Sequence, residues 1–174
     1  MVILTRRGLL LGASALTAAS LLPYRMATAQ AARPYHALLI ACTTYPNLPP
    51  RASLVGPNHD AVLVREFLTT QAGFAPANVT LLADEVEGAA GSPTHAGILE
   101  AFASLTKRIV DEAKGGRSDA FVYIHLSGHG TQQPQSIVND ETDGLDEVFL
   151  PRDIELWEDQ SKGIPNALMD NEIG

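Results

Sequence analysis

The sequence is poor in cysteine, with a single residue, Cys42, and poor in aromatic residues, which make up 6% of it. One cysteine cannot form an internal disulfide, so a disulfide-linked framework is excluded. The chain has no CxxC pair and no HExxH segment, so neither of these zinc-binding patterns is present. Cations are also scarce: 12 Lys and Arg stand against 20 Asp and Glu, for a net charge of −8. Because nucleic-acid binding needs clustered cations, this balance argues against that function.

The acidic residues are concentrated in the last part of the chain. From Asn139 onward there are eleven carboxylates and two cations, Arg152 and Lys162. A charge run of this kind usually forms a solvated surface. The alternative is a site for a cation or for a basic substrate.

The first 31 residues have the pattern of an export signal. Arg6 and Arg7 precede an apolar run of about fourteen residues, whereas a membrane-spanning helix needs about twenty. Small residues at 27–31 suit signal peptidase, and the paired arginines resemble a twin-arginine signal. We therefore expect residues 1–31 to be a signal peptide and the mature protein to be periplasmic or secreted from a bacterium. No stable membrane span would then remain; the alternative is a helix that stays attached as an anchor.

The rest of the chain has ordinary globular composition, with 45% hydrophobic and 18% charged residues overall. Short apolar runs bounded by turn residues predict buried strands, and apolar residues at helical spacing predict two helices between them. The strands are expected at 36–42, 78–82 and 120–126, and the helices at 58–71 and from Ser92 or Thr94 to Gly115. This alternation predicts an α/β domain whose parallel sheet is covered on both faces.

A histidine follows the third predicted strand, where α/β sheets bind their ligands. His129 lies between Gly128 and Gly130, an environment that core packing explains poorly. Flanking glycines allow a sharp turn or a close approach by a substrate, and histidine is the commonest general base. We therefore predict that His129 is catalytic. His125, inside the strand, is expected to be structural and paired with an acceptor; a metal shared with His129 lacks a convincing third ligand.

The segment 123–130 resembles the strand-plus-histidine motif of caspase-like and metacaspase-type cysteine peptidases (peptidase family C14). Four further pieces follow the family's order: its first strand, the entry to its first helix, its acidic loop with the next strand, and the start of a later helix. They lie at 36–42, 54–61, 140–153 and 168–173. The resemblance covers residues 35–174 and implies a caspase-like three-layer α/β/α sandwich with a mostly parallel sheet. That domain would be the N-terminal, large-subunit part of the peptidase and would be incomplete at its C-terminus.

The resemblance implies a cysteine endopeptidase in which a thiolate attacks the peptide bond and His129 handles the proton. Caspase-type spacing puts the cysteine about fifty residues after the histidine. Only 45 residues follow His129, and none is cysteine. We therefore expect the nucleophile to lie in a missing C-terminal part or on a second chain. Cys42 is expected to be a small buried hydrophobe rather than a substitute nucleophile. The alternative is a catalytically inactive caspase-like binding or regulatory module.

The same resemblance implies peptide or protein substrates cleaved after Arg or Lys. Asp60 matches a carboxylate of the family's primary specificity pocket, and a carboxylate suits a guanidinium. The alternative for Asp60 is a helix N-terminal carboxylate favoured by the helix dipole. Ser127 and Gly130 fall beside the expected substrate backbone, although a local turn role suits Ser127 equally well. Arg51 leaves open a preference for acidic residues.

Many metacaspases need calcium, and the resemblance extends to the ligands. Asp146, Asp170 and Asn171 fall at the positions of the family's calcium-binding aspartates, with Asn171 replacing an acid by a neutral carbonyl. Oxygen ligands of this kind suit calcium. The alternative is a solvated acidic loop, because the spacing does not repeat an EF-hand.

Overall fold

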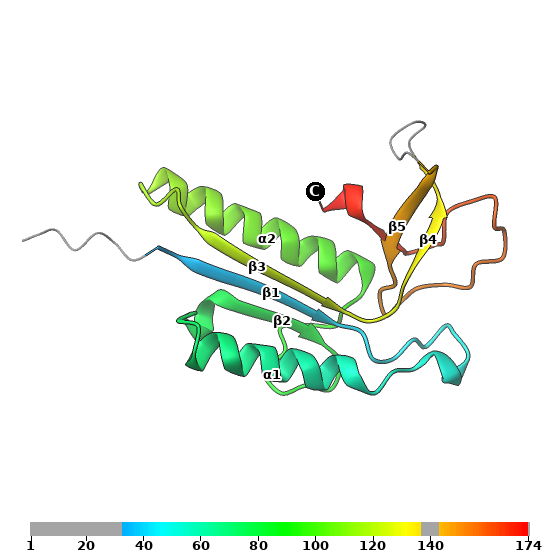
Figure 1. Ribbon diagram of the computed structural model, residues 1–174, viewed down its shortest axis with the longest axis horizontal. Helices are drawn as coiled ribbons and strands as arrows, with labels where there is room; N and C mark the ends of the chain where they lie inside the picture. Colours follow the sequence, from blue (N-terminus) through cyan, green and yellow to red (C-terminus); the bar gives the residue numbers. More distant parts are fainter. Residues whose placement is uncertain (1–32, 137–142, 174) are drawn as a thin grey trace, which may run out of the picture. The chain divides into compact units, whose positions relative to one another are not determined.

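The computed structural model describes residues 33–136 and 143–173 (Figure 1). The expected signal peptide, 1–31, therefore lies outside the described residues, as do Asp140 and Glu141 of the acidic loop. Within the described ranges, no helix combines the length and the apolar character needed to cross a membrane.

Three parallel strands form the central sheet, in the order β2-β1-β3. They are β1 (Tyr35–Ala41), β2 (Val79–Ala83) and β3 (Phe121–Ser127), each within about one residue of the predicted run. The middle strand is the most buried, because both of its edges are paired and both of its faces are covered. Its consecutive apolar residues therefore belong to two cores, one on each side of the sheet.

Two helices cover opposite faces of this sheet (Figure 1). Helix α1 (Gly56–Thr70) packs Ala61 and Leu68 against the face that carries Leu39. Helix α2 (His95–Lys114) places Ile98 on the other face, in the core that contains Leu38. Together the layers form the predicted α/β/α arrangement, and the expected α/β fold class is confirmed.

Helix α2 begins and ends at the residues that the sequence predicts. The Thr94 side chain caps the helix by accepting a 3.1 Å hydrogen bond from the Gly97 N–H, and Gly115 follows the last helical residue. A threonine cap contributes about 1 kcal/mol to helix stability. The prediction of Ser92 or Thr94 as the cap is therefore decided in favour of Thr94.

A second, antiparallel sheet in the order β4-β5-β6 follows the parallel one along the chain (Figure 1). Its strands are β4 (Gly130–Pro134), β5 (Leu145–Phe149) and β6 (Leu168–Met169). Strand β4 was not predicted, because its sequence Gly-Thr-Gln-Gln-Pro has no apolar alternation; its pairing with β5 forms it. The expected helix start at 168–173 is wrong for its first two residues, which pair with β5, and only a 3-10 turn, η3 (Asp170–Glu172), follows.

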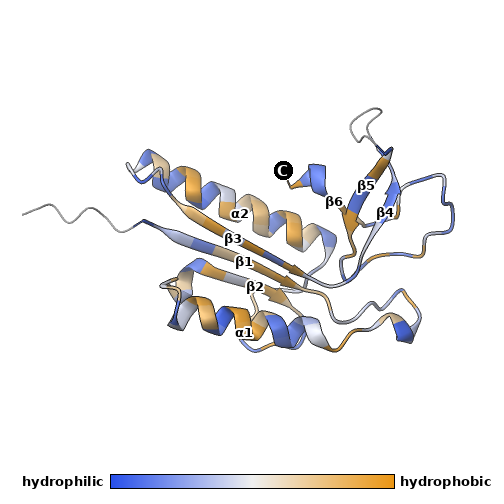
Figure 2. Ribbon diagram, viewed as in Figure 1, coloured by the Kyte–Doolittle hydropathy of each residue, from blue (hydrophilic) through white to orange (hydrophobic). Residues whose placement is uncertain are grey.

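No strand among the described residues pairs with the outer edge of β3. Within the described residues β3 pairs with β1 alone, and Val122, Ile124 and Leu126 are 38–39% exposed on the face shared with α2. Figure 2 shows β3 coloured as hydrophobic over much of its length. Parallel strands are normally covered on both edges and faces, so β3 has the composition of an interior strand and the exposure of an edge strand.

Candidate active site

The His129 ring is fixed by a backbone carbonyl. His129 follows β3 by two residues, and its Nε2 lies 2.8 Å from the carbonyl oxygen of Ala52, the last residue of the 3-10 turn η1 (Pro50–Ala52). A carbonyl oxygen can only accept a hydrogen bond, so Nε2 carries the proton. In the neutral ring Nδ1 is then the unprotonated nitrogen, with a lone pair available for a proton.

The backbone of His129 is held from two sides. Its N–H donates to the Tyr45 hydroxyl at 2.9 Å, and its carbonyl accepts from the Leu150 N–H at 2.9 Å. The Tyr45 hydroxyl in turn donates to the Cys42 carbonyl, and its ring centroid lies 5.1 Å from that of His129. Burial raises the pKa of Tyr45 to about 12, so the phenol keeps its proton at neutral pH.

The glycine before the histidine lies in a tightly packed position. A Cβ atom on Gly128 would lie 3.0 Å from the Phe149 ring and 3.0 Å from the Tyr45 hydroxyl oxygen. Gly130 begins β4 opposite Phe149, and a Cβ there would lie 3.3 Å from the Val148 carbonyl oxygen. The glycines therefore allow β5 and the Tyr45 loop to approach the histidine closely.

Cys42 is buried and cannot serve as the nucleophile in this arrangement. It directly follows β1, its side chain is inaccessible, and its Sγ lies 3.7 Å from the Pro93 carbonyl oxygen. Burial raises the pKa of Cys42 to about 12, with a further contribution from the negative charge of Asp84. Because the thiolate is the reactive form, this thiol is inert at neutral pH. The expectation of a small buried hydrophobe is confirmed.

Asp84 contacts three segments that meet at the same edge of the sheet. It was not predicted from the sequence. Its carboxylate accepts hydrogen bonds from Thr44 Oγ1 at 3.2 Å and from Ser92 Oγ at 2.6 Å. Its Oδ2 also lies 2.6 Å from Nε of Arg152, three residues beyond β5. Asp84 thereby ties the end of the antiparallel sheet to the parallel one, beside the Leu150 amide that holds His129.

The expected substrate-binding residues lie close to this edge in the chain. Asp60 is exposed in the second turn of α1, whose start is held there by the bond from the Asn58 N–H to Thr43 Oγ1. Ser127 is half-buried at the end of β3, and its carbonyl accepts from the Cys42 N–H at 2.8 Å. Gly130 is exposed at the start of β4. No contact tests a role for these residues toward a substrate, so those roles stay predictions.

The expected calcium ligands come together in part. Asp146 on β5 is 1% exposed, and its Oδ2 accepts a 2.8 Å hydrogen bond from the Ser136 N–H. Asn171 Nδ2 donates to Ser136 Oγ at 3.4 Å, so Asp146 and Asn171 meet at Ser136. Asp170 accepts the Asn171 N–H instead. Within residues 33–136 and 143–173, no three His, Cys, Asp or Glu side chains form a metal-binding group.

The expected partner of His125 is not found. Its Nε2 is buried and has no hydrogen-bond partner among the described residues, and its ring stacks on Tyr123 with centroids 6.5 Å apart. The prediction that the His125 ring pairs with a hydrogen-bond acceptor is therefore wrong. The paired buried histidine is His36 on β1, whose Nε2 lies 3.0 Å from the Glu112 carboxylate.

Two groups that hold His129 were not predicted. Tyr45 lies in the Thr-Thr-Tyr-Pro segment after β1, where its position at the carboxyl end of a strand could have drawn attention. The Ala52 carbonyl leaves no signal in the sequence, because every residue has a carbonyl group.

Residues 35–171 match the family described as "Metacaspase, peptidase C14 domain". The chain belongs to the metacaspase family. Metacaspase-9 of Arabidopsis thaliana is 34% identical over 123 residues, which cover 71% of this chain and 35% of the relative. Metacaspase-1 of Yarrowia lipolytica is 30% identical over 119 residues, covering 68% of this chain and 23% of the relative.

This metacaspase domain therefore spans about a quarter to a third of the length of these relatives. A crystal structure of a Geobacter sulfurreducens protein is similar to it with a TM-score of 0.49 and 23% identity, over 80% of this chain and 42% of that one.

Proposed function

We propose that this metacaspase domain provides the histidine half of a cysteine endopeptidase site that cleaves after Arg or Lys. The observation that carries the proposal is the bond between His129 Nε2 and the Ala52 carbonyl. It leaves Nδ1 as the proton acceptor, and it gives the ring, once protonated, a fixed acceptor for its other N–H. The cysteine nucleophile comes from polypeptide outside this chain, because Cys42 is buried and neutral.

The reaction proceeds in two steps. Nδ1 of His129 takes the cysteine proton, the thiolate attacks the carbonyl carbon, and a C–S bond forms. The C–N bond then breaks as His129 returns the proton to the leaving amine. In the second step His129 accepts a proton from water, whose oxygen attacks the acyl carbon. The C–S bond breaks, the carboxylic acid leaves, and His129 returns its proton to the thiolate. The Ala52 carbonyl stabilises the imidazolium that forms in each step.

The open edge of β3 is the place from which the nucleophile is supplied. A strand that pairs in parallel with β3 ends at the same edge of the sheet as His129, because parallel strands share a direction. It would also cover the exposed side chains of Val122, Ile124 and Leu126. A segment that continues this chain and a second polypeptide both satisfy this geometry.

Asp60 is the proposed partner of the substrate's Arg or Lys. It is exposed and forms no ion pair with a described residue, so its carboxylate is free to accept a cation. Ser127 and Gly130 are the proposed neighbours of the substrate backbone. Asp60→Asn is expected to raise KM for Arg-ended peptides far more than for neutral ones.

Calcium is the proposed activator, held by Asp146 with Asn171 and Asp170. Asp146 is a buried carboxylate, and no Lys, Arg or His among the described residues forms an ion pair with it. A buried charge is costly unless it is compensated, and a cation with oxygen ligands compensates it. Calcium should therefore raise the thermal unfolding temperature of the chain, and Asp146→Asn should abolish that increase.

Two experiments test the peptidase proposal. The first expresses the chain with the coding sequence that continues it and measures cleavage of Arg- and Lys-ended fluorogenic peptides, with and without calcium. His129→Ala should abolish cleavage, whereas His59→Ala, an exposed histidine on α1, should leave it unchanged. Cleavage that survives in His129→Ala would contradict the proposal, and a continuation without any cysteine would leave a second polypeptide as the source of the nucleophile or an inactive binding module.

The second experiment needs only the present chain. Nitrogen-15 chemical shifts of the imidazole distinguish the two neutral tautomers of His129. We expect a protonated Nε2 and an unprotonated Nδ1; the opposite tautomer would remove the observation on which the mechanism depends.

A further inference from the structure

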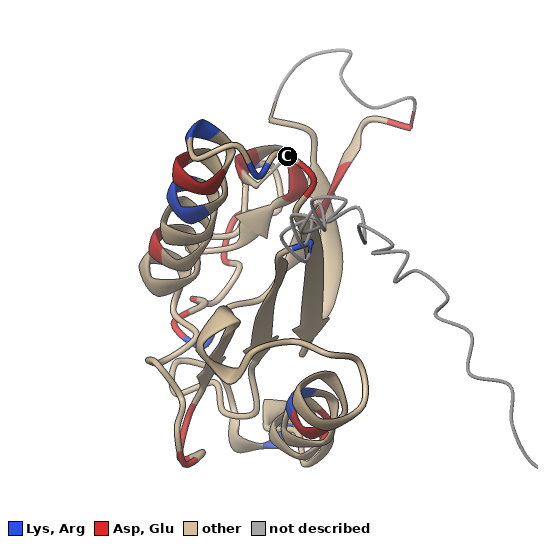
Figure 3. Ribbon diagram, turned by 90° about the vertical axis from the view of Figure 1, so that its left-hand side faces the viewer, with Lys and Arg blue, Asp and Glu red and all other residues tan. Residues whose placement is uncertain are grey.

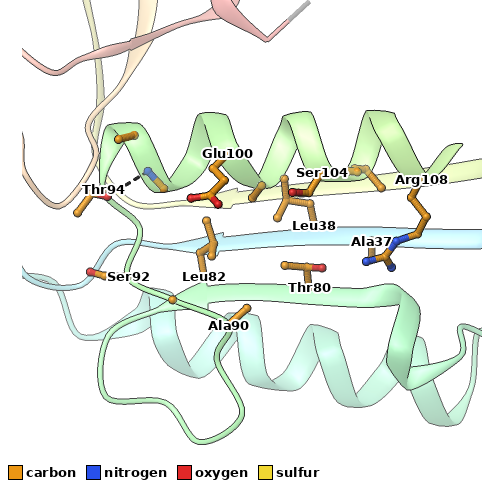
Figure 4. A pocket seen from close by; sticks show the side chains of 15 residues that line it. Ala37, Leu38, Thr80, Leu82, Ala90, Ser92, Thr94, Glu100, Ser104 and Arg108 are labelled. Carbon is orange, nitrogen blue, oxygen red and sulfur yellow. Dashed lines mark hydrogen bonds between the residues drawn. The ribbon is translucent and has the colours of Figure 1, made fainter. Parts of the chain in front are cut away.

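A groove of about 660 Å³ lies between α2 and strands β1 and β2 (Figure 4). Its volume is in the range of small-ligand sites. The groove exists because α2 presents small residues to this side, so the helix does not fill the space above the sheet. Those residues are Ala96, Gly97, Ala101 and Ser104.

The lining of the groove is mixed. Leu38 and Leu82 lie at the base of the groove on the sheet, where they are 1% and 5% exposed. The side chains of Thr80 and Ser104 are among those that line it, from the sheet and from α2 respectively (Figure 4). Hydroxyl groups both donate and accept hydrogen bonds, so this lining suits a ligand with peptide amides as well as apolar surface.

Among the described residues, the two charged side chains of the groove are those of α2 that form no ion pair. On the rest of this helix, Lys107 and Lys114 pair with Asp111, and Glu112 pairs with Arg117. Figure 3 shows both signs of charge along the helix. Glu100 and Arg108 form no ion pair within the described parts of the chain, although both line the groove.

The spacing of these charges defines the ligand. Glu100 and Arg108 are separated by eight helical residues, or about 12 Å along the axis. Figure 4 shows both side chains reaching from α2 toward the sheet. One guanidinium nitrogen of Arg108 donates to the Ala77 carbonyl at 3.1 Å, which holds the side chain over the start of β2. An extended peptide of about four residues, at about 3.3–3.6 Å each, bridges this distance.

We propose that the α2–β2 groove binds short zwitterionic peptides. The peptide's amino terminus lies at Glu100 and its carboxylate lies at Arg108, where charge-assisted hydrogen bonds form. Thr80 and Ser104 bond to the amides between the two ends, and small apolar side chains rest on Leu38 and Leu82. This inference does not depend on the proposed peptidase reaction, since none of these residues contacts His129.

Tetra-alanine is the probe, and its N-acetylated, C-amidated form is the matched ligand control. Isothermal titration calorimetry of the chain should give binding of free tetra-alanine about tenfold or more tighter than binding of the blocked form. Glu100→Gln and Arg108→Gln should each weaken binding of the free peptide severalfold. Lys107→Gln, next to Arg108 but paired with Asp111, is the variant control and should bind normally.

Ser104→Phe tests the position of the ligand, because it fills the groove from an exposed site on the helix. This variant should abolish binding while its circular dichroism and unfolding temperature stay unchanged. The proposal is overturned if free and blocked tetra-alanine bind equally, if neither binds at millimolar concentration, or if Lys107→Gln and Arg108→Gln weaken binding alike. Amide shifts confined to β3, away from α2 and β2, would overturn it as well.

Discussion

At the scale of single residues, Gly128 is the position in the site with the least room for a side chain. The 3.0 Å contacts that a Cβ would make there, with the Phe149 ring and the Tyr45 hydroxyl, are tighter than nearly all real Cβ contacts, so these two side chains would have to shift. We expect Gly128→Ala to cost about 1–3 kcal/mol of unfolding free energy, as overpacking usually does. Gly91→Ala is the control, because its Cβ would lie 3.7 Å from Leu82, an ordinary contact. Urea unfolding measures both, and equal losses in the two variants would contradict this packing.

Cys42 predicts how stability depends on alkaline pH. Burial raises its pKa from 9.0 to about 12, so above pH 9 the unfolded chain loses a proton that the native state keeps. Stability from this residue is complete below pH 9 and declines toward pH 12, by at most about 1.4 kcal/mol per pH unit. Tyr45 adds a similar decline above pH 10. Between pH 9 and 10, the stability of Cys42→Ala should therefore fall less steeply than that of the wild type; parallel curves would show that the thiol does not contribute.

At the scale of elements, the joint between the two sheets depends on charge. Arg152 pairs with Asp84, and the Arg152 N–H donates to the Pro93 carbonyl at 3.0 Å. The arginine side chain is 36% exposed, so solvent reduces the contribution of the ion pair. We expect Arg152→Ala to cost about 1–2 kcal/mol.

Hydrogen exchange shows whether Arg152→Ala destabilises only the contact at Leu150 or the whole domain. The Leu150 amide, which bonds to the His129 carbonyl, should exchange faster in Arg152→Ala relative to amides of β1. Arg117→Ala removes a pair between a half-exposed arginine and Glu112, far from β5 in the chain, and serves as the control, with little change expected at Leu150. Uniform acceleration of all amides would mean that Arg152 stabilises the fold without positioning β5.

At the scale of the whole molecule, the open edge of β3 should promote self-association. Unpaired backbone groups and exposed apolar side chains on an edge strand are a template for pairing with another chain. Ile124→Lys should therefore lower the fraction of dimers and larger species in sedimentation velocity. Val110→Lys, which alters an exposed apolar residue on α2, is the control. A monomeric wild type, or an equal effect of both variants, would contradict the prediction.

Export is a second prediction at the scale of the whole chain. We expect residues 1–31, fused to a reporter that folds before export, to deliver it to the bacterial periplasm. Changing Arg6 and Arg7 together to Lys should retain the reporter in the cytoplasm, because the paired arginines are the feature that resembles a twin-arginine signal. Arg25→Lys is the control. Periplasmic reporter in the Arg6–Arg7 double variant would exclude twin-arginine export.

The sequence by itself determined the parts of the fold that local patterns encode. Continuous apolar runs specified the three parallel strands, and Thr94 specified the start of α2, because burial and capping are properties of neighbouring residues. The glycine-flanked His129 at the end of β3 also followed from the sequence, since a strand's carboxyl end is a local feature that the sheet turns into a common edge.

Only the tertiary structure decided which distant groups meet at that edge. The Ala52 carbonyl has no side-chain signal, and Asp84 and Arg152 lie far apart in the chain until packing brings them within 2.6 Å. Strand β4 forms because β5 pairs with it, although its own residues favour no strand. The burial of Cys42 likewise depends on the segment around Pro93. Contacts of this kind are set by how elements pack against each other, which local sequence patterns do not record.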